Sequence, residues 1–333
     1  MKPIFLLLAC LIIGSCKDVS VNEDAENIYQ FLEGEMVPNT EEFYAMDEPF
    51  SLNFSEFSRD GSKIVYTKFT NRPHRPRFGV FIYDVGSAQE NLLVLDGYLA
   101  SWSPDAEWVA FNIYPQIYKI KSNGDSLTKL TNGAGSFNPR WSPDGKRIGF
   151  EGNTRNNVMN SDGSGLGFIG DNGFGAIADW HPSGTKVLGV HRTQQPTRKM
   201  GVFNLQTNRT EQIIDLGVRS SGKILYSPDG SRICFNSERG IYVMNADGSN
   251  RKRILPTDTS PDRFPDYKGG IKLLVGMPSW HPDGKHLLYA HFRVTRYEIR
   301  DGIITGFRIG LEGYYSLYTV NVDSAVAVST LPN

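Results

Sequence analysis

The chain has 333 residues, and its 35 Lys and Arg are balanced by 36 Asp and Glu, which leaves a net charge of −1. A nearly neutral chain has no overall electrostatic attraction to nucleic acid or to a membrane surface, so recognition by charge has to be local. Its 39% of hydrophobic residues and its 34 Gly are typical of one large all-β domain made of strands and turns.

Residues 1–16 have the pattern of an export signal. They begin with Lys2 and continue with an apolar stretch at 4–13, which is too short to span a bilayer as a stable helix. The stretch ends in Ile-Gly-Ser-Cys16, which resembles the lipobox of bacterial lipoproteins. The resemblance implies that Cys16 becomes the acylated N-terminus and anchors the protein to a membrane. An ordinary secretory signal that ends nearby is the alternative.

Residues 17–48 are polar and acidic. We expect them to form a tether between the membrane and a folded domain at 49–333. Once the signal is removed and Cys16 is acylated, Cys234 is the only free thiol, so we expect no intrachain disulfide.

The domain at 49–333 consists of repeated units. The most regular unit runs from Tyr226 to Leu255, where turns at 227–230 and 245–248 separate short strands. Pro, Asp, Asn and Gly occupy these turns because they favour the backbone angles and local hydrogen bonds that turns need. The first turn, an aromatic residue followed by a variant of Ser-Pro-Asp-Gly, occurs six times at intervals of 39 to 54 residues, beginning at Phe57, Trp102, Trp141, Trp180, Tyr226 and Trp280.

Units of about forty residues with four strands each predict the blades of a propeller. We therefore predict an all-β fold, a six-bladed β-propeller of four-stranded antiparallel blades, with the first strand of each blade innermost. The expected blades are contiguous in sequence and span about 50–97, 98–134, 135–174, 175–218, 219–257 and 275–331.

The two turn motifs, recurring in phase, resemble the repeat of TolB-type propellers. Residues 241–250, IYVMNADGSN, are close to the second half of that repeat, and the resemblance covers roughly residues 50–330. It implies a cell-envelope protein that binds partners. The segment before residue 49 is too short for the separate α/β domain that precedes the propeller of TolB, so partner contacts made through that domain are not implied here.

The repeat also explains residues that would otherwise indicate binding sites. Because Trp102, Trp141, Trp180 and Trp280 share one position in the repeat, we expect them to pack between blades rather than to form a sugar-stacking surface. The Asp and Asn residues at 245–250 superficially resemble calcium ligands. Position 256 is Pro, where a calcium loop has its last Glu, so we expect an ordinary hairpin turn.

Three histidines, His281, His286 and His291, fall within blade 6. Clustered histidines hold a metal in some propeller lyases that act on uronate sugars, so a metal site would be expected here if anywhere. His286 and His291 would lie roughly 16 Å apart along one strand, which is too far for ligands of one ion. We therefore predict no metal site, and we keep His286 and His291 as the alternative.

Loops that break the repeat are rich in arginine. Because loops of this kind share one face of a propeller, we predict that they form a basic rim that binds carboxylate or phosphate groups. The alternative is that these are ordinary solvated loops. The residues of the basic rim are Arg72, Arg75 and Arg77 in blade 1, Arg192 and Arg198 in blade 4, and Arg293 and Arg296 in blade 6.

These observations predict a non-enzymatic lipoprotein of the bacterial cell envelope, anchored at the outer membrane, whose propeller is a scaffold for binding an envelope protein or an anionic glycan. We predict no catalytic residue, no cofactor and no nucleic-acid partner, and we expect a monomer. The alternative function is a propeller lyase or hydrolase that acts on acidic polysaccharide with a metal near blade 6.

Overall fold

The computed structural model describes residues 55–323 with gaps at 71–76, 88, 134, 153–155, 171–173, 192–198, 219, 238–239, 257–271, 276–277, 295, 301–302 and 309–314. The predicted export signal, Cys16 and the tether therefore lie outside the described residues. Within the described part, no helix has the length and apolar character needed to cross a bilayer.

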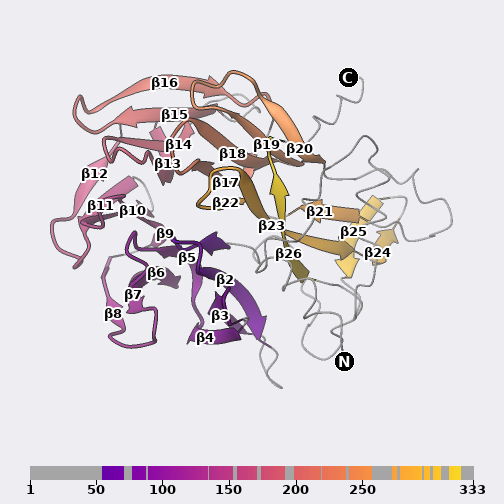
Figure 1. The fold of residues 1–333 in the computed structure, drawn as a ribbon, viewed down its shortest axis with the longest axis horizontal. Helices are drawn as coiled ribbons and strands as arrows, with labels where there is room; N and C mark the ends of the chain where they lie inside the picture. The colour runs from indigo at the N-terminus through magenta and orange to yellow at the C-terminus, as the bar shows by residue number, and fades with distance from the viewer. Residues whose placement is uncertain are drawn as a thin grey trace.

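Five antiparallel sheets follow one another along the chain, and each is made of four strands in consecutive order (Figure 1). We call them blades 1 to 5. Blade 1 is β1 (Glu56–Phe57), β2 (Lys63–Thr70), β3 (Arg77–Asp84) and β4 (Gln89–Leu95). Blade 2 is β5 (Tyr98–Trp102), β6 (Trp108–Ile113), β7 (Gln116–Lys121) and β8 (Thr128–Lys129). Blade 3 is β9 (Ser136–Trp141), β10 (Arg147–Gly152), β11 (Asn156–Asn160) and β12 (Gly167–Ile169).

The next two blades repeat the same order. Blade 4 is β13 (Phe174–Trp180), β14 (Lys186–His191), β15 (Lys199–Asn204) and β16 (Arg209–Asp215). Blade 5 is β17 (Ser220–Tyr226), β18 (Arg232–Ser237), β19 (Gly240–Asn245) and β20 (Lys252–Pro256). The fold is thus an all-β propeller of four-stranded antiparallel blades, and the prediction of contiguous blades is confirmed for these five.

The next sheet, which we call the sixth sheet, is built differently. Its first strand is interrupted, because β21 (Lys272–Val275) and β22 (Ser279–Trp280) both pair with β23 (His286–Val294). β26 (Tyr315–Asn321) also pairs with β23, and the hairpin of β24 (Arg296–Arg300) and β25 (Ile303–Arg308) lies between them in sequence. Among the described residues, strand pairing in this sheet begins at Lys272, close to the start predicted near residue 275.

Side-chain hydrogen bonds fix the turn between the first two strands of a blade. In blade 5, Ser227 Oγ donates to Asp229 Oδ1 at 2.6 Å, and the main-chain N–H of Ser231 donates to the same oxygen at 3.0 Å. Gly230 then takes a φ of 77°, which glycine adopts without strain. Blade 2 has Ala106 at this position with a φ of 58°, so its Cβ is held in a backbone region that L-residues avoid.

Apolar side chains fill the space between neighbouring sheets. Four buried clusters join blade 1 to 2, blade 2 to 3, blade 3 to 4 and blade 4 to 5. A fifth cluster contains Leu225 of blade 5 and Leu287 of β23, and a sixth contains Leu288 of β23 with Phe57 of blade 1. The sixth sheet therefore packs on blade 5 with one face and on blade 1 with the other.

The tryptophans of the turn motif pack between sheets as predicted, and all four are buried. Three of them also donate an indole hydrogen bond to a carbonyl of the preceding sheet. Trp141 is the exception, because its buried Nε1 has no hydrogen-bond partner among the residues that the structure describes. The three bonds are Trp102 Nε1 to Glu56 O at 3.1 Å, Trp180 Nε1 to Arg140 O at 3.1 Å, and Trp280 Nε1 to Leu225 O at 3.3 Å.

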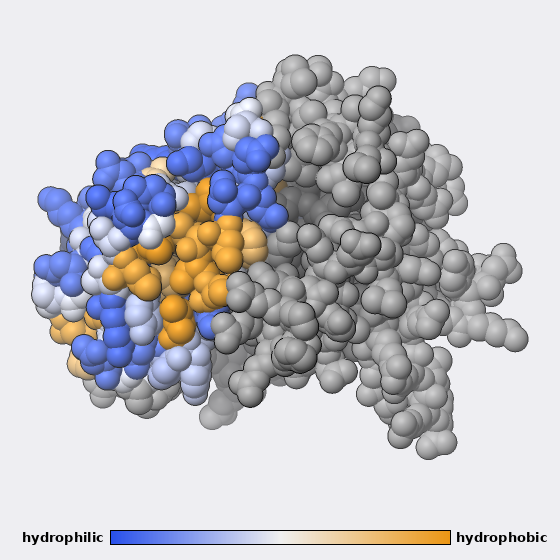
Figure 2. Space-filling model, turned by 90° about the horizontal axis from the view of Figure 1, so that it is seen from below, coloured by the Kyte–Doolittle hydropathy of each residue, from blue (hydrophilic) through white to orange (hydrophobic). Residues whose placement is uncertain are grey.

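On the face shown in Figure 2, the hydrophobic residues of the described surface gather in one large central patch and one smaller group at the lower left, and most of the remaining described surface is hydrophilic. Large apolar side chains that are exposed include Leu92 of β4, Phe168 of β12 and Ile213 of β16, each from the last strand of its blade. Cys234 is buried in β18, the second strand of blade 5, and it is a free thiol.

Candidate functional site: a charge network at the centre of the ring

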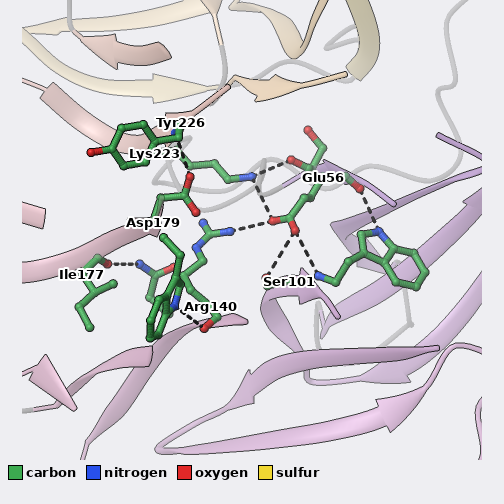
Figure 3. A network of polar contacts seen from close by, with 11 residues as sticks. Glu56, Ser101, Arg140, Ile177, Asp179, Lys223 and Tyr226 are labelled. Atoms are coloured by element: carbon green, nitrogen blue, oxygen red, sulfur yellow. Dashed lines mark hydrogen bonds and ion pairs between the residues drawn. The ribbon is translucent and has the colours of Figure 1, made fainter. Parts of the chain in front are cut away.

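Charged and polar side chains from the first strands of different blades meet at the centre of the propeller. Several of them occupy the position directly before the aromatic residue of the turn motif: Glu56, Ser101, Arg140 and Asp179. Since the first strands of separate blades can touch only around the axis of a ring, this contact confirms that the first strand is innermost. Figure 3 shows these side chains converging from blades 1 to 5. We call Glu56, Arg140, Asp179 and Lys223 the axial network.

Glu56 is the hub of the axial network. Its Oε2 lies 2.7 Å from Arg140 Nη1 and 3.8 Å from Lys223 Nζ, so one carboxylate faces two cations from blades 3 and 5. Its other oxygen, Oε1, accepts the main-chain N–H of Trp102 at 3.2 Å and is 3.4 Å from Ser101 Oγ in blade 2. One side chain thus joins blade 1 to three other blades.

The two cations are more deeply buried than the acid that they face. The side chains of Arg140 and Lys223 are 6% and 1% exposed, whereas that of Glu56 is 20% exposed. Lys223 Nζ also donates to the main-chain oxygen of Ser55 at 2.8 Å. Burial, together with the charge of Arg140, lowers the pKa of Lys223 to about 8, while the charge of Glu56 opposes the change.

Asp179 extends the network to blade 4. Its Oδ2 accepts the main-chain N–H of Tyr226 in blade 5 at 2.8 Å, so it links these two blades. Its position among the blades raises the pKa of Asp179 to about 7 by desolvation, although the charge of Arg140 opposes this. A carboxyl group with this pKa is half protonated near neutral pH, and the charge of the network therefore changes with pH.

The arrangement serves cohesion of the ring. Each charged group has a partner on another blade, and opposite charges are nearly balanced, as buried charges require. Perturbed pKa values also occur at catalytic sites, but ionic networks that hold a structure together produce the same shifts. The axial network was not predicted from the sequence. A signal was present, because five of the six units place a polar or charged residue directly before a buried aromatic residue.

The predicted basic rim remains a prediction. Arg72, Arg75, Arg192 and Arg198 lie outside the described residues. The backbone places Arg77 at the start of β3, Arg293 in β23 and Arg296 at the start of β24, and the structure does not describe their side chains.

The predicted alternative metal pair, His286 and His291, lies on β23, where the backbone of His291 pairs with Val275 and Ser316. The side chain of His291 lies outside the described residues, so a metal site formed by His286 and His291 remains a prediction. His286 does have metal-ligating neighbours, because ligand atoms of His281, Asp283 and His286 lie within 4.8 Å of one another. The predicted position of His281 in the turn is confirmed, whereas its approach to Asp283 was not predicted.

The calcium-like segment at 245–250 is a turn, as predicted. Asp247 Oδ1 accepts the main-chain N–H of Ser249 at 2.9 Å and its hydroxyl at 2.6 Å. Asn245 Nδ2 donates to Ser249 Oγ at 2.8 Å. These side-chain oxygens are therefore engaged in fixing the hairpin between β19 and β20.

The comparisons with known proteins support the fold. No family model matches the chain. TolB from Acinetobacter baumannii has a similar structure, with a TM-score of 0.51 at 18% identity over 68% of this chain and 66% of that one, so this chain spans just under two thirds of its length. A putative TolB from Agrobacterium tumefaciens gives 0.51 at 18% identity over 72% and 96%. Hydrazine synthase of Kuenenia stuttgartiensis gives 0.51 at 14% identity over 79% and 80%. At these identities the likeness concerns the fold alone.

Proposed function

We propose that this chain is a non-enzymatic binding protein of the bacterial cell envelope, held at the outer membrane by an acylated Cys16, with a propeller that recognises an envelope protein or an anionic glycan. The observation that carries the proposal is the axial network. It uses the charged groups of the innermost strands to hold five blades together. A rigid ring of this kind is a scaffold, and recognition then falls to the loops on its rim.

We further propose that the sixth sheet is the sixth blade of a closed ring. It repeats the tryptophan contact of the other blades, because the indole of Trp280 donates to Leu225 O in blade 5. It also meets blade 1, because His281 contacts Phe57 edge-to-face with ring centroids 4.8 Å apart. The split first strand and the inserted β24–β25 hairpin are departures of one blade from the common pattern.

The proposed ligand-binding surface is the basic rim. Replacing Arg72, Arg75 and Arg77 with Ala should weaken retention of the purified protein on an immobilised anionic polysaccharide and should reduce the salt dependence of that retention. The matched control replaces three exposed cations elsewhere, Arg59, Lys129 and Lys252, with Ala and removes the same charge. Equal losses in both triple variants would show that net charge, rather than the basic rim, is responsible.

The lipid anchor is tested separately. Cells that express the chain are labelled with radioactive palmitate and fractionated, and the Cys16→Ala variant is compared with the wild type. We expect label and membrane association in the wild type and neither in the variant. A variant that remains in the membrane fraction would contradict anchoring through Cys16.

A further inference from the structure

The turn between β22 and β23 differs from the corresponding turn of every other blade. It reads His281-Pro-Asp283-Gly-Lys-His286, whereas blade 5 reads Ser227-Pro-Asp-Gly-Ser-Arg232. The position of His281 is Ser in blades 1, 2, 3 and 5. The position of His286 is Lys or Arg in four blades and Trp in blade 2. Two imidazoles therefore flank the aspartate of this turn and of no other.

The two carboxylate oxygens of Asp283 make different contacts. Its Oδ1 accepts the main-chain N–H groups of Lys285 and His286 at 2.7 and 3.0 Å, and this maintains the turn. Its Oδ2 faces both imidazoles, at 2.6 Å from His286 Nδ1 and 3.1 Å from His281 Nδ1. Three ligand atoms of the types that bind divalent transition metals thus converge on one point, all within 4.8 Å.

The orientation of His281 brings its Nδ1 to this point. The main-chain N–H of Asp283 donates to His281 Nδ1 at 3.2 Å, so Nδ1 acts as an acceptor there. A nitrogen lone pair and a carboxylate oxygen only 3.1 Å apart repel each other unless a proton or a metal ion lies between them, and a bound ion would take the lone pair that otherwise accepts the N–H of Asp283. The far nitrogen of the ring, Nε2, points toward blade 1, where a Cβ added to Gly61 would lie 3.7 Å from it. The ring is therefore held with Nδ1 toward Asp283.

The group is open to ions from solvent. The side chains of His281, Asp283 and His286 are 34%, 34% and 26% exposed. From these observations we propose that this turn binds one divalent transition-metal ion of the Zn²⁺ class through His281 Nδ1, Asp283 Oδ2 and His286, with water completing the coordination. Binding displaces the proton that His286 shares with Asp283, so it releases a proton to solvent.

An ion bound in this turn would affect the stability of the fold, because the turn lies between the sixth sheet and blade 1. His281 packs edge-to-face on Phe57, and Pro282 Cγ would lie 3.6 Å from a Cβ on Gly61, so the turn forms the contact between the sixth sheet and blade 1. This is the junction at which the first and last sheets of the chain meet. An ion that fixes His281 would also fix this junction, and Zn²⁺ should therefore stabilise the whole fold.

The experiment measures binding of Zn²⁺ to the purified protein by equilibrium dialysis with metal analysis, together with Tm in the presence and absence of Zn²⁺. We expect one ion per chain and a rise in Tm of about 5 °C when free Zn²⁺ exceeds Kd a hundredfold. Co²⁺ in place of Zn²⁺ should give the visible absorption of a tetrahedral site. No saturable binding, or binding without any rise in Tm, would overturn the proposal.

The variants use residues that the repeat itself supplies, so that each should fold. His281→Ser restores the residue of blades 1, 2, 3 and 5, and His286→Arg restores that of blades 3 and 5. Both should abolish the bound ion and the rise in Tm. His181→Ser in blade 4 is the control, because its turn has Ser183 in place of the aspartate and should not affect binding. Full binding by both test variants would place the ion elsewhere and refute the assignment.

Discussion

The most informative single substitution is Glu56→Gln, because it removes one charge and leaves the size of the side chain unchanged. Arg140 Nη1 lies 2.7 Å from the carboxylate, and the attraction at this distance is worth about 6 kcal/mol at an effective dielectric constant of about 20. Glu56 is 20% exposed, so solvent replaces part of that attraction. Breaking a buried pair costs about 3 to 5 kcal/mol, and we take the lower value.

We therefore expect Glu56→Gln to lower the free energy of unfolding by about 3 kcal/mol and Tm by about 6 °C. The measurement is guanidinium denaturation, with Glu107→Gln as the control at an exposed site, where the change should stay within about 0.5 kcal/mol. Lys223→Met removes the second buried cation, so the double variant should recover about 1 kcal/mol relative to Glu56→Gln alone. A stability of Glu56→Gln within about 0.5 kcal/mol of the wild type would refute the role of Glu56 as the hub.

Three further predictions test other parts of the structure. The pKa of Asp179 in the folded protein is about 7, above its ordinary value of 3.8, so the folded state holds this proton more tightly and the stability of the protein falls as the pH rises from about 4 to 7. Asp179→Asn should therefore raise Tm relative to the wild type at pH 8 but not at pH 4. Equal changes in Tm at the two pH values would contradict this. Ala106→Gly should raise the free energy of unfolding, measured by guanidinium denaturation, by about 1 kcal/mol, because glycine adopts the positive φ at this position without strain. A loss of stability would show that Ala106 is unstrained. Trp180→Phe should lower the free energy of unfolding by about 1 kcal/mol more than Trp141→Phe, because the indole of Trp180 donates a hydrogen bond to Arg140 O. Equal losses in the two variants would show that this hydrogen bond does not contribute to stability.

The sequence predicted what is local and repeated. The turn motif identified the blades because Ser227, Asp229 and Gly230 fix the turn by hydrogen bonds within a few residues, and these bonds follow from residue type. The tryptophans were predictable for the same reason, since a fixed place in the repeat implies a fixed place between blades.

The contacts across the ring were not predictable in this way. Glu56 and Arg140 are 84 residues apart and meet only because the ring brings the inner strands together. Which charged residue faces which partner depends on the rotation of each blade around the axis, and composition does not encode that. The histidines of the sixth sheet could be noticed in the sequence. Their approach to Asp283 could not, because it depends on the second carboxylate oxygen, Oδ2, which the hydrogen bonds of the turn do not use.

We propose that the protein binds its ligand without converting it. The most direct measurement incubates the purified protein with an acidic polysaccharide and follows both the retention of the polysaccharide on the protein and the length of its chains. We predict saturable retention that falls with added salt, while chain length stays unchanged after prolonged incubation with or without added Zn²⁺ or Mn²⁺. Shortened chains that carry unsaturated uronate ends would contradict the claim and would assign the protein to the propeller lyases.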